Sequence, residues 1–477
     1  MSGYETLDML IDGEWINERD SGEDVINPAT GQALARLPHA TTADLDRALA
    51  ASARAFPGWA ATSANDRAKI LRAGVMLLRE RQDSIARTLT LEQGKPLAES
   101  LGEVAYAIDC IEWYAEEGRR AYGRIVPSRN PGVRQFVTKE PVGPAIAFTP
   151  WNFPALTPAR KIGGALAAGC TLVLKAAEET PGTAIAIARA LVDAGVPPGV
   201  LNLVFGDPAT VSAHLIASPL SRKLSFTGST AVGRQLQHLA LDHGMMRTTM
   251  ELGGHGPVLV FDDVEVDATA DLLAAAKFRN AGQVCISPTR FFVQQKAYDR
   301  FVERFVMRSK ALVLGDGLDP ATNMGPLANP RRIDAMERLV ADAEARGGTV
   351  LTGGKRVGNQ GWFYEPTVIT GIGDDALVMT EEPFGPVVPI VPFTDFDEVI
   401  TRANALPYGL AAYAFAQDRT TAAKLGSALA AGMVGVNTLA VSTPETPFGG
   451  VKESGHGSES GIEGLDAYLD TKFIAEG

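Results

Sequence analysis

The chain has 477 residues, of which 45% are hydrophobic and 21% charged, proportions that are usual for a globular protein with a large core. At roughly 150 residues per domain this length predicts two to four domains. The net charge of −12, without a dense basic cluster, argues against a nucleic-acid partner, and six His and three Cys are too few for a multi-site metalloprotein or a disulfide framework.

Neither a targeting signal nor a membrane span is evident in the sequence. The first eight residues carry acidic side chains where a signal peptide carries basic ones. The longest uncharged stretch, 141–159, contains five prolines, which exclude a continuous helix. We therefore expect a cytoplasmic protein with no membrane partner.

The first half of the chain predicts helices followed by an α/β alternation. Residues 43–120 have apolar side chains near helical spacing. From residue 145, short apolar runs alternate with stretches long enough for crossover helices, which predicts a parallel, doubly wound sheet. The expected strands are 145–149, 171–175, 200–205, 224–227 and 258–261, and the expected helices are 158–168, 181–194, 208–218 and 231–242.

A second alternating series after residue 254 predicts a second α/β domain. The segment 122–140 has no helical period and is expected as a hairpin, and the tail 465–474 as a terminal strand. Such appendages often make subunit contacts. The expected helices are 268–280, 296–312, 330–346, 396–405 and 420–430, and the expected strands are 290–293, 363–370, 411–416 and 433–436.

Cys285 is the cysteine whose surroundings suggest chemistry. It follows a glycine-containing break after a helical stretch, where a free backbone amide can point at a reacting oxygen, which is compatible with a nucleophile. The alternative is a small core residue, and that interpretation suits Cys110 and Cys170.

Two further side chains are candidates for proton transfer and for stabilising a negative charge. Glu251 stands among apolar residues at a domain junction, where desolvation raises a carboxyl pKa and favours a base; a solvated glutamate is the alternative. Asn152, in a proline-bounded loop after a strand, can donate from an uncharged amide to an oxyanion, although a turn asparagine is commoner. His255 is interpreted as structural.

Two stretches are candidates for nucleotide binding. Residues 226–233 follow a strand and open a helix, so their amides and hydroxyls can meet phosphate, but they are neither GxGxxG nor a GK[ST] loop. Lys175 and Glu178 end another strand, where a doubly wound sheet binds its ligand. Solvated loop residues are the alternative.

Six motifs in this order resemble the aldehyde dehydrogenase superfamily over essentially the whole chain. They are FTPWNFP, FTGSTAVG, MELGG, NAGQVC, EEPFGPV and PFGGVKESG. The resemblance implies two doubly wound α/β domains and a small β oligomerisation element. It divides the chain into an NAD(P)-binding domain (1–121 and 142–253), a catalytic domain (254–448) and an oligomerisation hairpin and tail (122–141 and 449–477).

The resemblance also implies roles for individual residues. Cys285 would be the nucleophile, Glu251 the general base that hydrolyses a thioester, and Asn152 with the Cys285 N–H the oxyanion hole, and no metal is needed. The presence of Glu251 favours release of a free acid over transfer to coenzyme A. The residues implied for the cofactor are Thr149, Pro150, Trp151, Lys175, Glu178, Gly228, Ser229, Gly233, Leu252, Glu382 and Phe384.

Three positions that are often aromatic in relatives acting on apolar aldehydes are Arg160, Arg279 and Ser442 here. Two guanidinium groups with a hydroxyl predict a carboxylate clamp. Arg279 would lie about 9 Å along a helix from Cys285. Phe153 and Phe448 complete the expected substrate pocket; the alternative is that each arginine pairs with a neighbouring acid.

This pattern resembles the succinate-semialdehyde and 2-oxoglutarate semialdehyde dehydrogenases. It predicts NAD(P)-dependent oxidation of a short ω-oxo acid to the dicarboxylic acid. Glu178 would repel a 2′-phosphate, which favours NAD, with NADP as the alternative. The remaining alternatives are a non-acidic aliphatic or aromatic aldehyde, a binding protein without catalysis, and a thiol hydrolase side activity. A homodimer or homotetramer is expected.

Overall fold

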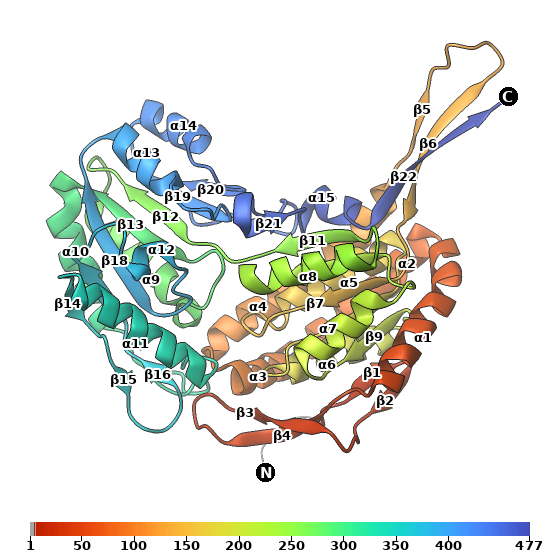
Figure 1. The fold of residues 1–477 in the computed structure, drawn as a ribbon, viewed down its shortest axis with the longest axis horizontal. Helices are drawn as coiled ribbons and strands as arrows, with labels where there is room; N and C mark the ends of the chain where they lie inside the picture. Colours follow the sequence, from red (N-terminus) through yellow and green to blue (C-terminus); the bar gives the residue numbers. More distant parts are fainter. Residues whose placement is uncertain (1–3, 5) are drawn as a thin grey trace.

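The protein consists of two α/β units joined along one side, with a thin β arm projecting from the first (Figure 1). The structure is a computed structural model, which describes residue 4 and residues 6–477. Each unit has a sheet with its own cluster of buried hydrophobic side chains. The two doubly wound units that the sequence predicts are therefore confirmed.

The first unit contains an eight-stranded sheet whose central strands are parallel and buried. Its order is β2-β1-β9-β8-β7-β10-β11-β21. The sequence predicted the four central strands β7 to β10 but missed β1, β2, β11 and β21, and the expected strand 258–261 belongs to the sheet of the second unit instead. In that order the strands are β2 (Glu14–Ile16), β1 (Met9–Ile11), β9 (Leu201–Val204), β8 (Leu172–Lys175), β7 (Ala145–Phe148), β10 (Lys223–Thr227), β11 (Arg247–Glu251) and β21 (Gly455–His456).

Helices cover both faces of this sheet, and several begin or end where the sequence contains a capping residue. Thr41 and Asp44 form a capping box at the start of the first helix, and Gly94 and Gly169 adopt positive φ at the ends of the third and fifth. The helices are α1 (Thr42–Ala61), α2 (Ala64–Glu80), α3 (Gln82–Gln93), α4 (Leu97–Glu117), α5 (Leu156–Ala168), α6 (Pro181–Asp193), α7 (Pro208–Ala217), α8 (Thr230–His243) and α15 (Gly461–Asp466).

The second unit contains a seven-stranded sheet of order β14-β17-β18-β13-β12-β19-β20, in which only β14 runs antiparallel to its neighbour. Its strands are β12 (Gly256–Val260), β13 (Pro288–Gln294), β14 (Thr349–Thr352), β17 (Thr367–Thr370), β18 (Val387–Phe393), β19 (Ala411–Phe415) and β20 (Met433–Val436). Its helices are α9 (Val266–Phe278), α10 (Gln295–Lys310), α11 (Pro330–Ala345), α12 (Leu377–Thr380), α13 (Phe396–Asn404) and α14 (Arg419–Ala428).

One expected strand of this unit was wrong. Residues 363–370 form two separate strands, β16 (Phe363–Tyr364) and β17, because Pro366 interrupts the run. The shorter strand pairs with β15 (Arg356–Val357) in a sheet of its own. A further two-stranded sheet, β3 (Gly22–Ile26) with β4 (Ala33–Pro38), was not predicted.

The projecting arm is the expected hairpin with the expected terminal strand added to it. β6 (Arg134–Pro141) pairs with β5 (Arg124–Val126) on one side and with β22 (Leu469–Glu476) on the other, both antiparallel. The tail does more than join this arm, however: β21 belongs to the first sheet and α15 packs against α5. None of the described helices combines the length and apolar character needed to cross a bilayer.

Candidate active site

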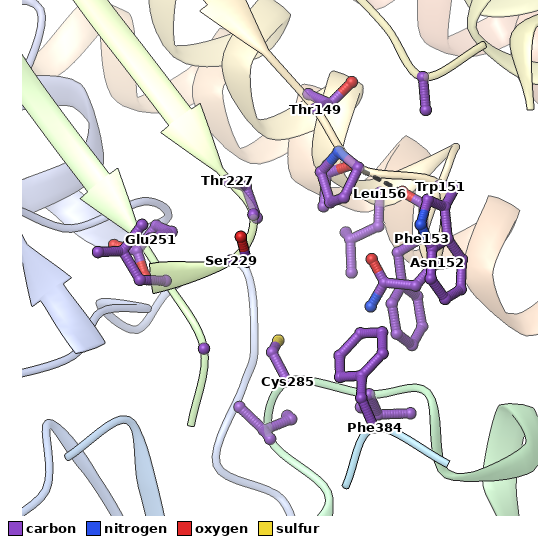
Figure 2. Close-up of a pocket in the computed structure, with 18 of the residues that line it drawn as sticks. Thr149, Trp151, Asn152, Phe153, Leu156, Thr227, Ser229, Glu251, Cys285 and Phe384 are labelled. Atoms are coloured by element: carbon purple, nitrogen blue, oxygen red, sulfur yellow. Dashed lines mark hydrogen bonds between the residues drawn. The ribbon is translucent and has the colours of Figure 1, made fainter. Parts of the chain in front are cut away.

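A cavity of about 1250 Å³ lies between the two units and receives side chains from both. On the first unit it follows the carboxyl ends of β7, β8, β10 and β11, the edge at which doubly wound sheets bind ligands. All the site residues expected from the sequence line it except Gly233. Figure 2 shows Cys285, Asn152 and Phe384 directed into the same space, with Glu251 across from them.

Cys285 lies in a loop that the sequence did not predict correctly. α9 ends at Phe278, and Asn280, Ala281 and Gly282 all adopt positive φ, of 49°, 52° and 76°. The expected helix to residue 280 and the 9 Å helical rise from Arg279 to Cys285 are therefore wrong. The left-handed turn brings the loop back toward the first unit.

The surroundings of Cys285 favour the protonated form of its thiol. Burial, together with the nearby negative charges of Glu382 and Glu251, raises the pKa of Cys285 to about 12, while the charge of Arg160 opposes this rise. A thiolate is the reactive form of a cysteine. The side chain consequently needs help to lose its proton before it can act as a nucleophile.

Asn152 is fixed next to the loop that carries Cys285. Its Nδ2 donates to the backbone O of Gln283 at 3.1 Å. An amide nitrogen carries two hydrogens, so one remains to face a ligand in the cavity. An uncharged donor held in one orientation suits the stabilisation of a developing alkoxide.

Glu251 is the last residue of β11 and is buried with neither carboxylate oxygen hydrogen-bonded among the described residues. Burial raises the pKa of Glu251 well above its usual value, and the negative charge of Glu459 adds to this, while Lys161 and Arg160 oppose it. Lys161 and Glu459 themselves form a buried ion pair at 2.5 Å. A carboxylate without a hydrogen-bond partner and with a raised pKa is a stronger proton acceptor than an ordinary one, which suits a general base.

The far end of the cavity has the polar groups expected for an adenosine ribose. Lys175 Nζ donates to Glu178 Oε2 at 2.6 Å, and the N–H of Gly206 donates to Glu178 Oε1 at 3.3 Å. Burial raises the pKa of Glu178, whereas the charge of Lys175 lowers it. The carboxylate is thus pre-oriented, and it is already partly neutralised by the lysine.

The middle of the cavity fits a pyrophosphate. Ser229 caps the N-terminus of α8, so the positive end of that helix faces the cavity. The hydroxyls of Thr149 and Thr227 line it and have no hydrogen-bond partner among the described residues. These donors, together with the volume, fit a dinucleotide. Gly233 does not reach the cavity: a Cβ there would overlap Leu252, so its role is close packing of α8.

Glu382 and Phe384 lie on the second unit beside Cys285. Glu382 Oε1 accepts from the Gly254 N–H at 3.1 Å, and burial raises the pKa of Glu382 to about 7. The Phe384 ring contacts Trp151 edge-on, with centroids 5.6 Å apart. Arg332, which no motif marked, places its guanidinium 5.8 Å from the same ring.

The two predicted arginines are placed differently. Arg160 is 3% exposed, and its Nη2 donates to Ser442 Oγ at 3.0 Å and lies 3.4 Å from the Tyr106 hydroxyl. Its guanidinium lies 4.0 Å from the centroid of the Phe448 ring. Its Nε has no partner among the described residues. This guanidinium is therefore buried among two hydroxyls and a ring, with no carboxylate bonded to it among the described residues.

Arg279 is exposed at the cavity rim, 5.6 Å from the Phe153 ring centroid. Tyr106 belongs to α4 and was missed, because a tyrosine within a helical pattern is normally read as a core residue. The interpretation of His255 is confirmed: it is buried between the Thr289 hydroxyl and the Val378 carbonyl. Cys110 and Cys170 are buried as expected.

Comparison with known proteins places the chain among oxidoreductases. The family described as "Aldehyde dehydrogenase family" matches residues 15–474. A putative 4-(hydroxymethyl)benzenesulfonate dehydrogenase of Comamonas testosteroni is 48% identical, covering 99% of this chain and 98% of its own. The NADP(+) succinate-semialdehyde dehydrogenase of Escherichia coli is 45% identical, covering 98% and 97%. The crystal structure of a Burkholderia pseudomallei succinate-semialdehyde dehydrogenase superposes with a TM-score of 0.96 at 43% identity, covering 98% of each chain.

Proposed function

The chain belongs to the aldehyde dehydrogenase family, and from that premise we propose that it oxidises a short ω-oxo acid, such as succinic semialdehyde, to the dicarboxylic acid. The observation that carries the substrate class is the buried guanidinium of Arg160, which lines the cavity that contains Cys285 and bonds to hydroxyls rather than to a carboxylate among the described residues. A buried charge needs a partner, and the carboxylate of the substrate would supply it.

The chemistry follows from three side chains. The Cys285 sulfur, once deprotonated, adds to the aldehyde carbon, and the oxygen becomes an alkoxide that Asn152 Nδ2–H and the Cys285 N–H would stabilise. When the alkoxide collapses to a carbonyl, the hydrogen on the same carbon leaves as hydride, for which a bound nicotinamide cofactor would be the acceptor, and a thioester to Cys285 remains. Water then attacks the thioester while Glu251 takes its proton; the C–S bond breaks, the acid is released, and the Cys285 thiolate leaves and can take the proton back from Glu251.

The cofactor is assigned to the first unit, residues 1–121 and 142–253, and the nucleophile to the second, 254–448. We assign NAD as the preferred cofactor because the carboxylate of Glu178 would lie at the adenosine ribose and repel a 2′-phosphate. The ion pair with Lys175 weakens that repulsion. NADP is therefore the alternative cofactor, and rates with NAD and with NADP should be compared.

The β arm is proposed as a subunit contact. Its sheet has two open edges, β5 and β22, and it exposes Ile125 and Phe473 to solvent at 77% and 59%. Open strand edges with apolar side chains favour pairing with another chain. Light scattering should report a dimer or tetramer, and the double variant Ile125→Asp/Phe473→Asp should reduce the mass. An unchanged mass would contradict this assignment.

The substrate is tested by the initial rate of NADH formation with a matched panel. Succinic semialdehyde is compared with butanal, which has the same chain length without the carboxylate, and benzaldehyde is compared with its 4-sulfonate. The sulfonate belongs in the panel because of the Comamonas relative and because Phe448 lies beside Arg160. We expect each anion to exceed its neutral match by a hundredfold or more; similar rates within a pair would overturn the proposed substrate class.

A further inference from the structure

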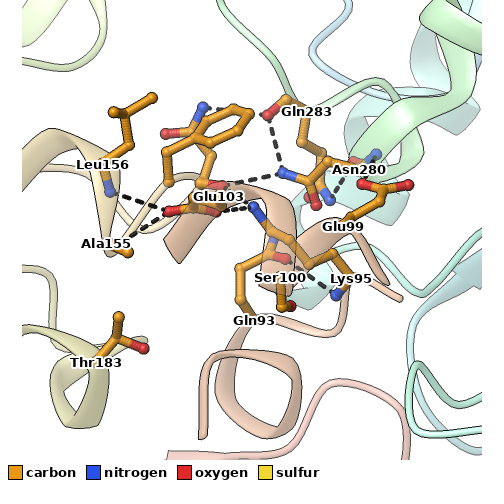
Figure 3. Close-up of polar contacts among 12 residues, drawn as sticks. Gln93, Lys95, Glu99, Ser100, Glu103, Ala155, Leu156, Thr183, Asn280 and Gln283 are labelled. Carbon is orange, nitrogen blue, oxygen red and sulfur yellow. Dashed lines mark hydrogen bonds and ion pairs between the residues drawn. The ribbon is translucent and has the colours of Figure 1, made fainter. Parts of the chain in front are cut away.

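A buried ion pair between Lys95 and Glu103 (Figure 3) contacts the loop that carries Asn152. Lys95, in the connection between α3 and α4, places its Nζ 2.5 Å from Glu103 Oε2, and both side chains are almost wholly buried. The same ammonium group donates to the backbone O of Asn152 at 2.8 Å and lies 4.1 Å from the ring centroid of Phe153. One lysine therefore holds two successive residues of the cavity wall.

Glu103 fixes the other end of this loop. Its second oxygen, Oε1, accepts from the N–H groups of Ala155 at 2.8 Å and Leu156 at 3.2 Å, at the start of α5. Amides in the first turn of a helix lack intrahelical partners, and a carboxylate there is favourable. The pair Lys95–Glu103 thus spans the loop from residue 152 to residue 156.

The loop of the nucleophile is tied to the same point. Asn280 Nδ2 donates to the Asn152 O at 3.1 Å and to the Gln283 O at 3.2 Å, and the Asn280 N–H donates to Glu99 Oε2 at 2.8 Å. The Asn152 carbonyl therefore accepts one bond from each side of the cavity. These bonds also support the left-handed turn that precedes Cys285.

We infer that Lys95, held by Glu103, is a positioning residue for the Asn152 amide. The inference rests on the proposed role of Asn152 as an alkoxide donor. One amide hydrogen is used on Gln283, so the direction of the other depends on where the residue 152 backbone sits. An oxyanion donor displaced by about 1 Å loses much of its effect, on the order of a hundredfold in rate.

The test compares two reactions of the same thiol. Aldehyde oxidation passes through an alkoxide, whereas alkylation of Cys285 by iodoacetamide displaces iodide and forms none. In Lys95→Met we expect kcat/KM for succinic semialdehyde to fall about 10- to 100-fold and the alkylation rate to stay within about twofold. Lys69→Met, which breaks the exposed Lys69–Asp66 pair, is the matched control and should change neither rate.

The role is separated from a purely structural one by a double-variant cycle. In an Asn152→Ala background, Lys95→Met should lower kcat/KM by less than about threefold. Asn152→Ala has already removed the amide donor that Lys95 positions, so Lys95→Met cannot remove its effect a second time. Equal losses in oxidation and alkylation, or a full additional loss in that background, would overturn the inference. If Lys95→Met does not fold, the same two reactions are measured with Glu103→Gln, which weakens the ion pair that fixes the Lys95 ammonium group. A wild-type protein that oxidises no aldehyde would instead refute the proposed function.

Discussion

Replacing Arg160 by Met removes the charge of the proposed anion anchor while keeping a long apolar side chain against Phe448. A hydrogen-bonded charge pair in a desolvated site is worth about 2–5 kcal/mol when one partner is removed. At about 1.4 kcal/mol per tenfold, kcat/KM for succinic semialdehyde should fall about 30- to 4,000-fold. We expect the lower part of this range because the hydroxyls of Tyr106 and Ser442 remain.

The same substitution should leave the fold intact, which makes the measurement interpretable. Arg160 bonds to hydroxyls rather than to a carboxylate, so its removal strands no buried negative partner. The melting temperature, followed by circular dichroism, should change little. Butanal, which has no carboxylate to lose, should be slowed much less than succinic semialdehyde, and only because the Arg160 charge no longer lowers the pKa values of Cys285 and Glu251.

Arg279→Met is the internal comparison, because Arg279 is exposed at the rim. An exposed ion pair is worth about 1 kcal/mol or less, so the loss with succinic semialdehyde should be at most about fivefold. If Arg160→Met slowed succinic semialdehyde and butanal by the same factor, Arg160 would not be the anchor of the substrate carboxylate. A larger loss in Arg279→Met than in Arg160→Met would move the anchor to the rim.

Three further outcomes follow from the charges around the cavity. Alkylation of Cys285 in the free enzyme should quicken about tenfold per pH unit between about pH 7 and 9, since its pKa is raised to about 12; a plateau in this interval would contradict the assignment. Glu251 accepts a proton only in its deprotonated form, and the negative charge of Glu459 raises the pKa of Glu251. Glu459→Gln should therefore move the acid limb of the pH dependence of kcat to lower pH. A shift of that limb to higher pH would refute the electrostatic argument. Glu178→Ser should raise the ratio of kcat/KM for NADP over NAD by about tenfold or more, because it removes the repulsion of the 2′-phosphate; an unchanged ratio would show that Glu178 does not select the nucleotide.

The local hydrophobic pattern of the sequence was sufficient to predict the central strands of the first sheet and the helices between them. Buried parallel strands are short continuous apolar runs, and β7, β8, β9 and β10 follow that pattern. The outer strands of this sheet were missed because they are short, of two or three residues at β1, β2 and β21, and because their pairing depends on distant partners. β1, for example, finds its neighbour in β9, across most of the first unit in sequence.

The cavity shows a similar division. Cys285, Glu251 and Asn152 stand in motifs whose order is readable along the chain, and the expected cofactor residues of the first unit, apart from Gly233, lie at or just after the ends of strands. Tyr106 and Lys95 carry no such mark, because each lies in or next to a helix whose sequence reads as ordinary packing. Only their contacts with Arg160 and with the Asn152 carbonyl identify them.

The sequence by itself determined the two α/β units, the family resemblance and the chemical types at the reacting centre, because these depend on local periodicity and on motifs within a few residues of one another. The tertiary structure alone decided which arginine is buried, how the loop before Cys285 turns, and which charges raise the pKa values of Glu251 and Cys285. Burial and electrostatic coupling depend on distances between segments that are far apart in the chain, and no local pattern records those distances.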